Sequence, residues 1–90
     1  MSQDTRDLIE LPAYFLFKAI VRPEAINGDD LMVLIKNKLN RDLGNYEISD
    51  KPSRNGKYHS YSINLYIEIY EEIEMVYKIF KDHDAVVMAL

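Results

Sequence analysis

The sequence predicts a small α+β domain in which two helices cover one face of a four-stranded antiparallel sheet. Ninety residues, 48% of them hydrophobic, suffice for one folded domain with a thin core. Segments of alternating apolar residues and segments of helical spacing follow one another in the order β-α-β-β-α-β. Two helices cannot cover both faces of such a sheet, so both are expected on the same face. Right-handed crossovers then place the first and third strands in the centre, which is the ferredoxin-like sandwich.

The first strand is expected over residues 14–21, which are rich in aromatic and β-branched side chains. Residues 1–7 before it alternate charge without an apolar period and are expected to form a loose tail, so the single domain covers residues 8–90. Alternation assigns Phe15, Phe17, Ala19 and Val21 to one face of the strand, and Leu16, Lys18 and Ile20 to the other.

The first helix is expected to begin after Asn27, a good N-cap residue that is followed by two aspartates. Gly44 suits the C′ position that ends it. One apolar stripe follows from the helical spacing of Leu31, Leu34, Ile35 and Leu39.

A β-hairpin is expected to follow this helix. Its first strand, residues 45–51, places Tyr46 and Ile48 on one side, and Pro52 indicates an edge strand. Residues 53–56 form the loop, where Asn-Gly tolerates positive φ. Residues 57–67 have the clearest alternation in the chain. One face receives His59, Tyr61, Ile63, Leu65 and Ile67, and the other receives Tyr58, Ser60, Ser62, Asn64 and Tyr66.

The second helix lacks a starting signal of its own, because alternation runs on through Ile69 and no capping residue precedes the helix. Its apolar stripe comprises Ile69, Ile73, Val76, Tyr77 and Phe80. Residues 85–90 form the last strand.

These assignments predict two different faces of the sheet. The face toward the helices is expected to carry Phe15, Phe17, Ala19, Ile63, Leu65, Val86 and Met88. The open face is expected to carry Leu16, Lys18, Ile20, Tyr58, Ser60, Ser62, Asn64 and Val87. Leu16, Ile20, Tyr58, Val87 and Ala89 would form an apolar patch around Lys18 on the open face, and such patches often mark interfaces.

Composition and charge exclude several classes of function. The net charge of −4 and the pI of about 5.0 argue against nucleic-acid binding, which depends on basic patches. The absence of cysteine excludes disulfides, thiolate chemistry and cysteine-ligated zinc. The apolar run of residues 13–17 is too short to span a bilayer, and residues 1–7 lack a signal core. The expectation is a cytoplasmic protein without membrane contact.

Two groups of residues could be read as chemical sites. His59 beside Ser60 suggests a nucleophile with its base, but neighbouring strand residues point to opposite faces. Asp82, His83 and Asp84 suggest a metal site, but three successive loop residues seldom converge on one ion. Structural roles are favoured for both groups, so no catalytic residue, metal or cofactor is expected.

One segment also carries a family resemblance. Lys51-Pro52-Ser53, then Gly56, Tyr58-His59-Ser60 and Ser62-Ile63, resembles the hallmark of the YbeD-like family of small bacterial proteins of unknown function. The opening Glu10-Leu11-Pro12 and the ending at residues 84–90 are similar to the same family. The resemblance implies a ferredoxin-like fold similar to the ACT regulatory domains of amino-acid metabolism, and hence a regulatory role.

The leading hypothesis is a non-enzymatic regulatory or protein-interaction domain that binds a small metabolite through its carboxylate or phosphate. It would self-associate or bind a protein through the open face or an edge strand. The alternative is an RNA-binding module, which shares this element order, and a small enzyme is the third hypothesis. The candidate ligand- or partner-binding residues are Lys18, Lys51, Ser53, Tyr58, His59, Ser60 and Ser62.

Overall fold

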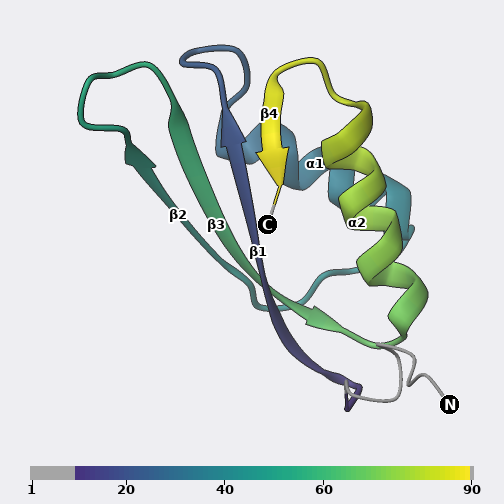
Figure 1. The fold of residues 1–90 in the computed structure, drawn as a ribbon. Coiled ribbons are helices and arrows are strands. Elements are labelled where there is room, and N and C mark those ends of the chain that lie inside the picture. The colour runs from purple at the N-terminus through teal and green to yellow at the C-terminus, as the bar shows by residue number, and fades with distance from the viewer. Residues whose placement is uncertain (1–9, 90) are drawn as a thin grey trace, which may run out of the picture.

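A computed structural model describes residues 10–89, and the predicted tail and Leu90 lie outside that range. Four strands form one sheet in the order β2-β3-β1-β4 with antiparallel pairing throughout, and both helices pack on the same face (Figure 1). The ferredoxin-like prediction is therefore confirmed. The elements are β1 (Ala13–Val21), α1 (Gly28–Leu39), β2 (Glu47–Pro52), β3 (His59–Ile67), α2 (Tyr70–Asp82) and β4 (Val86–Ala89).

The core lies between the sheet and the two helices, where alternate strand residues meet the apolar stripes. Phe17 of β1, Ile63 of β3 and Phe80 of α2 are fully buried. Burying one such side chain stabilises the fold by about 1.5–3 kcal/mol. The predicted helix-facing alternation of β1 and β3 is confirmed except at the ends of the strands, where Phe15 and His59 are only half-buried.

Helix α1 begins as predicted and ends earlier than predicted. The Oδ1 of Asn27 accepts a hydrogen bond of 2.8 Å from the backbone N–H of Asp30, as an N-cap should. Asn40 closes the helix in the left-handed conformation with φ of 55°, and Gly44, which is also left-handed, lies further along the loop. Leu34 was wrongly placed in the buried stripe: it is 36% exposed, because the stripe turns through Met32 instead.

Helix α2 starts without a side-chain cap. Ile69 occupies the N-cap position in extended backbone and is 53% exposed, so its place in the predicted buried stripe was wrong. Ile73, Val76 and Phe80 do form that stripe. No helix in residues 10–89 combines the length and apolar character required to cross a bilayer.

A partly buried ion pair joins the loop after α1 to α2 and to the end of β3. The guanidinium of Arg41 donates to both carboxylate oxygens of Glu72, at 2.7 and 2.9 Å, and to the carbonyl of Tyr66 at 2.7 Å. Oε1 of Glu72 also accepts from the backbone N–H of Glu68. The hydrogen bond from Arg41 outweighs desolvation and lowers the pKa of Glu72 below its ordinary value.

Strand β4 corrects the predicted open face. Its register shifts between Ile20 and Val21, so that Met88 pairs with Ile20 while Ala89 pairs with Ala19. Met88 was predicted to face the helices, but it is 53% exposed and lies beside Ile20 on the open face. Ala89 was predicted on the open face, but it packs against the core. One extra residue in the ladder reverses both assignments.

Candidate functional site

The β2–β3 hairpin is closed by its own polar side chains. The backbone N–H of Ser53 donates to the carbonyl of Tyr58 at 2.8 Å, and the N–H of Tyr58 donates to Oγ of Ser53 at 3.0 Å. Gly56 has a φ of 72°, which suits glycine at this turn. The hydroxyl of Ser53 also donates to Oδ1 of Asn55 at 3.1 Å. Ser53 is thus a structural residue of the loop as well as a member of the candidate site.

Register places four candidate residues together on the open face. Ser60 of β3 lies between Lys51 of β2 and Ile20 of β1, and Ser62 pairs with Lys18 in the next row along. Neighbouring strands are about 4.8 Å apart, and like-facing residues on one strand are about 7 Å apart. The two lysines therefore lie diagonally on either side of two serine hydroxyls, within reach of one small anion.

A cavity of about 570 Å³, here called the hairpin cavity, opens on this face at the end of the sheet where β2 turns into β3. Its apolar part comes from Ile20, Pro52 and the ring of Tyr58. Two cations, Lys51 and Arg54, line it, and no carboxylate does. The full lining is Ile20, Lys51, Pro52, Ser53, Arg54, Tyr58 and Ser60.

His59 is separated from the other candidate residues. It points to the helix side of the sheet, where its Nε2 lies 2.6 Å from Oδ2 of Asp50 and its ring packs 5.0 Å from that of Tyr61. The hydroxyl of Ser60 faces the opposite way, as the alternation argument predicts. The structure thus groups Lys51, Ser53, Tyr58 and Ser60 in one cavity, places Ser62 and Lys18 in the adjoining row, and leaves His59 outside.

Asp82, His83 and Asp84 were considered as a metal site, but a structural loop was favoured. Nδ1 of His83 accepts a hydrogen bond of 3.1 Å from the backbone N–H of Ala85, which fixes the loop before β4. Across residues 10–89 no group of three or more His, Asp or Glu side chains is arranged to hold a metal ion.

Two features of the open face were not assigned to a site from sequence. Tyr14 and Tyr66 pair across β1 and β3 with ring centroids 5.3 Å apart, and they are 54% and 36% exposed. Tyr14 also donates from its hydroxyl to the carbonyl of Asn45 at 3.2 Å. Tyr14 already begins the predicted first strand, and continuing the open-face alternation from Leu16 back to it would have placed it on this face. Arg54 could have been found as a cation at the tip of a hairpin whose base was already a candidate.

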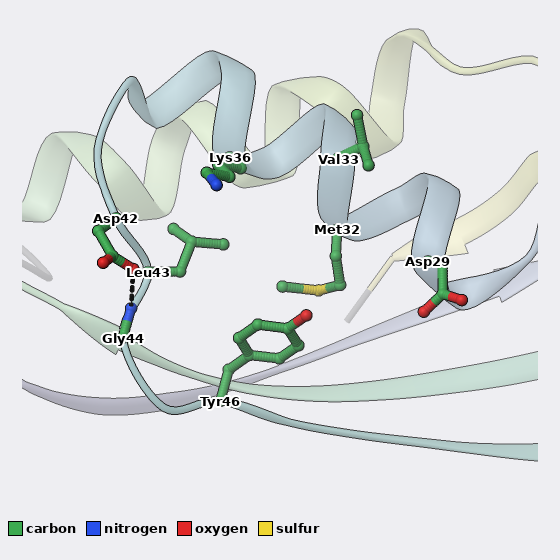
Figure 2. A pocket seen from close by; sticks show the side chains of 8 residues that line it. All are labelled: Asp29, Met32, Val33, Lys36, Asp42, Leu43, Gly44 and Tyr46. Carbon is green, nitrogen blue, oxygen red and sulfur yellow. Dashed lines mark hydrogen bonds between the residues drawn. The ribbon is translucent and has the colours of Figure 1, made fainter.

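A second cavity lies on the far side of β2, between α1 and the loop that leads into the strand (Figure 2). The side chains of Met32 and Leu43 and the ring of Tyr46 line its apolar part, with Asp29 at one end and Lys36 and Asp42 at the other. Its volume is about 310 Å³. Tyr46 precedes β2 and lines this cavity, although it was predicted to lie within the strand. The mixed charges give no preference for one sign of ligand, and Oδ1 of Asp42 is already bonded to the N–H of Gly44.

The fold resembles a solved structure. The solution structure of protein HP0495 from H. pylori matches with a TM-score of 0.73, covering 91% of this chain and 85% of that one. The two sequences are 19% identical, so the match shows a shared fold.

Sequence comparisons identify the family. A UPF0250 protein of Vibrio parahaemolyticus is 35% identical over 88 residues, which cover 94% of this chain and 89% of the relative. A UPF0250 protein of Cronobacter sakazakii is 33% identical over 92 residues, covering both chains completely. A family model described as protein of unknown function (DUF493) matches residues 6–90. The chain therefore belongs to this UPF0250 family of small bacterial proteins, which confirms the predicted YbeD-like resemblance.

Proposed function

We propose that this protein is a non-enzymatic regulatory domain whose hairpin cavity binds a small metabolite through a carboxylate or phosphate group. One observation carries the proposal. In a chain with net charge −4, the cavity is lined by two cations and no carboxylate. Such a local excess of positive charge attracts anions even when the whole molecule repels them.

The polar groups of the cavity fit an anion. Lys51 and Arg54 supply charged donors, which form hydrogen bonds roughly twice as strong as those between neutral groups. The hydroxyl of Ser60 adds a donor between them and the β1 strand. Lys18 lies one row along, where its long side chain can add a further charge.

The apolar lining indicates that the ligand is more than a bare anion. The cavity volume of about 570 Å³ falls within the range of sites for small organic molecules, roughly 300–1,000 Å³. Ile20, Pro52 and Tyr58 provide a surface for an apolar or planar body. A carboxylate or phosphate attached to such a body therefore fits better than inorganic phosphate alone.

The regulatory part of the proposal draws on the resemblance to ACT domains, which bind small effectors near their interfaces. The open face offers a surface for a protein partner or a second copy. Leu16 and Met88 are 60% and 53% exposed on it, and β2 and β4 are the edge strands of the sheet (Figure 1). A ligand in the hairpin cavity would lie beside that surface and would alter its charge.

Isothermal titration calorimetry with a panel of carboxylated and phosphorylated metabolites tests the proposal. At least one ligand of the panel should bind the wild-type protein. The Lys51→Met and Arg54→Met substitutions should each weaken its affinity about tenfold, because each removes a charged hydrogen bond. Lys57→Met is the matched control, because Lys57 is exposed on the same hairpin but does not line the cavity. The proposed site would be contradicted if all three variants weakened the affinity equally, or if no compound of the panel bound the wild-type protein.

One specific observation supports the alternative function, RNA binding. Tyr14 and Tyr66 are exposed on the two central strands, where aromatic side chains can stack on unpaired bases. Fluorescence titration with oligo-uridylate at low salt tests it, with Tyr14→Ala as the diagnostic variant. Absence of binding at low salt, where electrostatic attraction is strongest, would remove this alternative.

A further inference from the structure

A third cavity adjoins the hairpin cavity on the open face. It has a volume of about 540 Å³ and is lined by Leu16, Tyr46, Glu47, Ile48, Ser49, Ser62 and Asn64. The two linings meet because Ser60 and Ser62 are like-facing neighbours on β3, and Lys51 and Ser49 are like-facing neighbours on β2. The two cavities share no lining residue but follow one another along β2 and β3, and we refer to them together as the β2–β3 trough.

The floor of this trough is polar and accessible to solvent. Ser60, Ser62 and Asn64 alternate along β3, are half-buried, and point away from the helices. Within residues 10–89 their side chains have no hydrogen-bonding partner. Hydroxyl and amide groups both donate and accept, which matches the alternating N–H and C=O groups of an extended peptide.

The two ends of the trough carry opposite charges. Lys51 and Arg54 line one end, and Glu47 lines the other. Glu47 and Lys51 face the same way on β2, four residues apart, which corresponds to about 13 Å. An extended peptide of about four residues has the same length, since each residue spans about 3.3 Å.

From these observations we propose that the β2–β3 trough binds an extended peptide of about four residues. Its C-terminal carboxylate lies between Lys51 and Arg54, and a cationic group at its other end lies near Glu47. The inference rests on the proposed function, because it uses the same anion site, and it names the class of ligand. Glu47 disfavours an oligonucleotide, whose phosphates would continue along the trough past this carboxylate.

The same chemistry can come from two sources. A free short peptide supplies the cation from its own N-terminus. The C-terminal tail of a partner protein supplies it from the side chain of a lysine that is the fourth residue counted from the C-terminus. Tetra-alanine with free termini represents the first source. N-acetyl-Lys-Ala-Ala-Ala represents the second, because acetylation removes the terminal charge and the lysine replaces it.

Calorimetric titration of the full chain with these two peptides tests the proposal. At least one peptide should bind more tightly than acetate. Amidation of the C-terminus of that peptide should weaken its affinity about tenfold, and the Lys51→Met substitution should do the same. Glu47→Gln should weaken it by a smaller factor of about three to five, because this end of the trough is exposed. Glu10→Gln, an exposed glutamate outside the trough, should change nothing.

The outcomes separate this inference from the proposed function. If carboxylated metabolites bind in a Lys51-dependent way while neither peptide exceeds acetate, the peptide inference is wrong and the anion site remains. If neither metabolites nor peptides bind, both are wrong. The inference would be overturned in favour of a nucleic-acid ligand if oligo-uridylate displaced a bound peptide and if Tyr14→Ala abolished the binding of oligo-uridylate.

Discussion

The two faces of strand β3 differ sharply in what holds their residues in place. On the helix side, Ile63, Leu65 and Ile67 are fully buried and belong to the core. On the open side, Ser60, Ser62 and Asn64 are half-buried polar residues whose side chains point away from that core. The same nine-residue strand therefore carries the stability of the domain on one face and a polar surface on the other.

This difference indicates where function can be sought. The helix-side residues are explained by burial alone, whereas the open-side residues contribute little to stability. Ser60 also lies beside the two cations of the hairpin cavity. The candidate site thus occupies the face that folding leaves free.

The largest effect is expected from truncation on the helix side of β3. Ile63→Ala should lower the free energy of unfolding by about 2–5 kcal/mol, because it removes buried methyl groups and leaves a cavity. The neighbouring change Ser62→Ala on the open side should stay within about 0.5 kcal/mol. Urea denaturation of both variants measures the contrast, and similar losses would show that the two faces do not differ as described.

The next largest effect concerns the ion pair in the helix layer. Arg41→Met should lower the free energy of unfolding by about 3 kcal/mol, since it leaves the buried carboxylate of Glu72 without its cationic partner. Lys78→Met breaks the exposed pair with Asp82 and serves as the control, with a loss below about 0.5 kcal/mol. Equal losses in the two variants would mean that burial of the pair does not matter.

The same ion pair predicts a dependence on pH. Arg41 lowers the pKa of Glu72 from its ordinary value of 4.5, so the stabilisation is present above that value and is lost as pH falls through the folded-state pKa. Wild type should therefore lose stability more steeply than Glu72→Gln between about pH 5 and pH 3. Urea midpoints across this range measure the difference, and parallel curves would contradict the assigned pKa shift.

A smaller effect is expected at the start of α1, outside the comparison of faces. Asn27→Ala removes the side-chain cap and should cost about 1 kcal/mol. Asn37→Ala, exposed within the same helix, is the matched control and should be nearly neutral or slightly stabilising. If Asn37→Ala were the more damaging change, the cap would not be the source of the stability.

The smallest effect on stability should accompany a clear effect on binding. Replacing both Ser60 and Ser62 by alanine should shift the unfolding free energy by less than about 1 kcal/mol. The same variant should weaken whichever anionic ligand the panel identifies, because it removes the hydroxyls between Lys18 and Lys51. Unchanged affinity would remove the serines from the site.

Much of the fold follows from local patterns in the sequence. The alternation in β3 and the cap at Asn27 are decided by neighbours in the chain, and both were predicted. Element order then limited the topology to the observed β2-β3-β1-β4 sheet. The candidate residues at the hairpin were found through family resemblance, and alternation correctly separated His59 from Ser60.

The errors arise where tertiary contacts override local pattern. Met88 and Ala89 were assigned to the wrong faces because a register shift in β4 cannot be read from four residues. The end of α1 was misplaced because both Asn40 and Gly44 adopt left-handed conformations, and only the structure shows which one closes the helix. The pairing of Arg41 with Glu72, 31 residues apart, left no local signal.

The central claim is that the open face around Lys51 and Ser60 is the binding surface of this protein. Two-dimensional amide NMR of the labelled chain, titrated with the ligand found by calorimetry, tests it most directly. Shifts should concentrate on Lys51, Arg54, Tyr58, Ser60 and Ser62, and the same shifts should need about tenfold more ligand in Lys51→Met. Shifts concentrated instead around Asp29, Met32 and Tyr46, at the cavity of Figure 2, would contradict it.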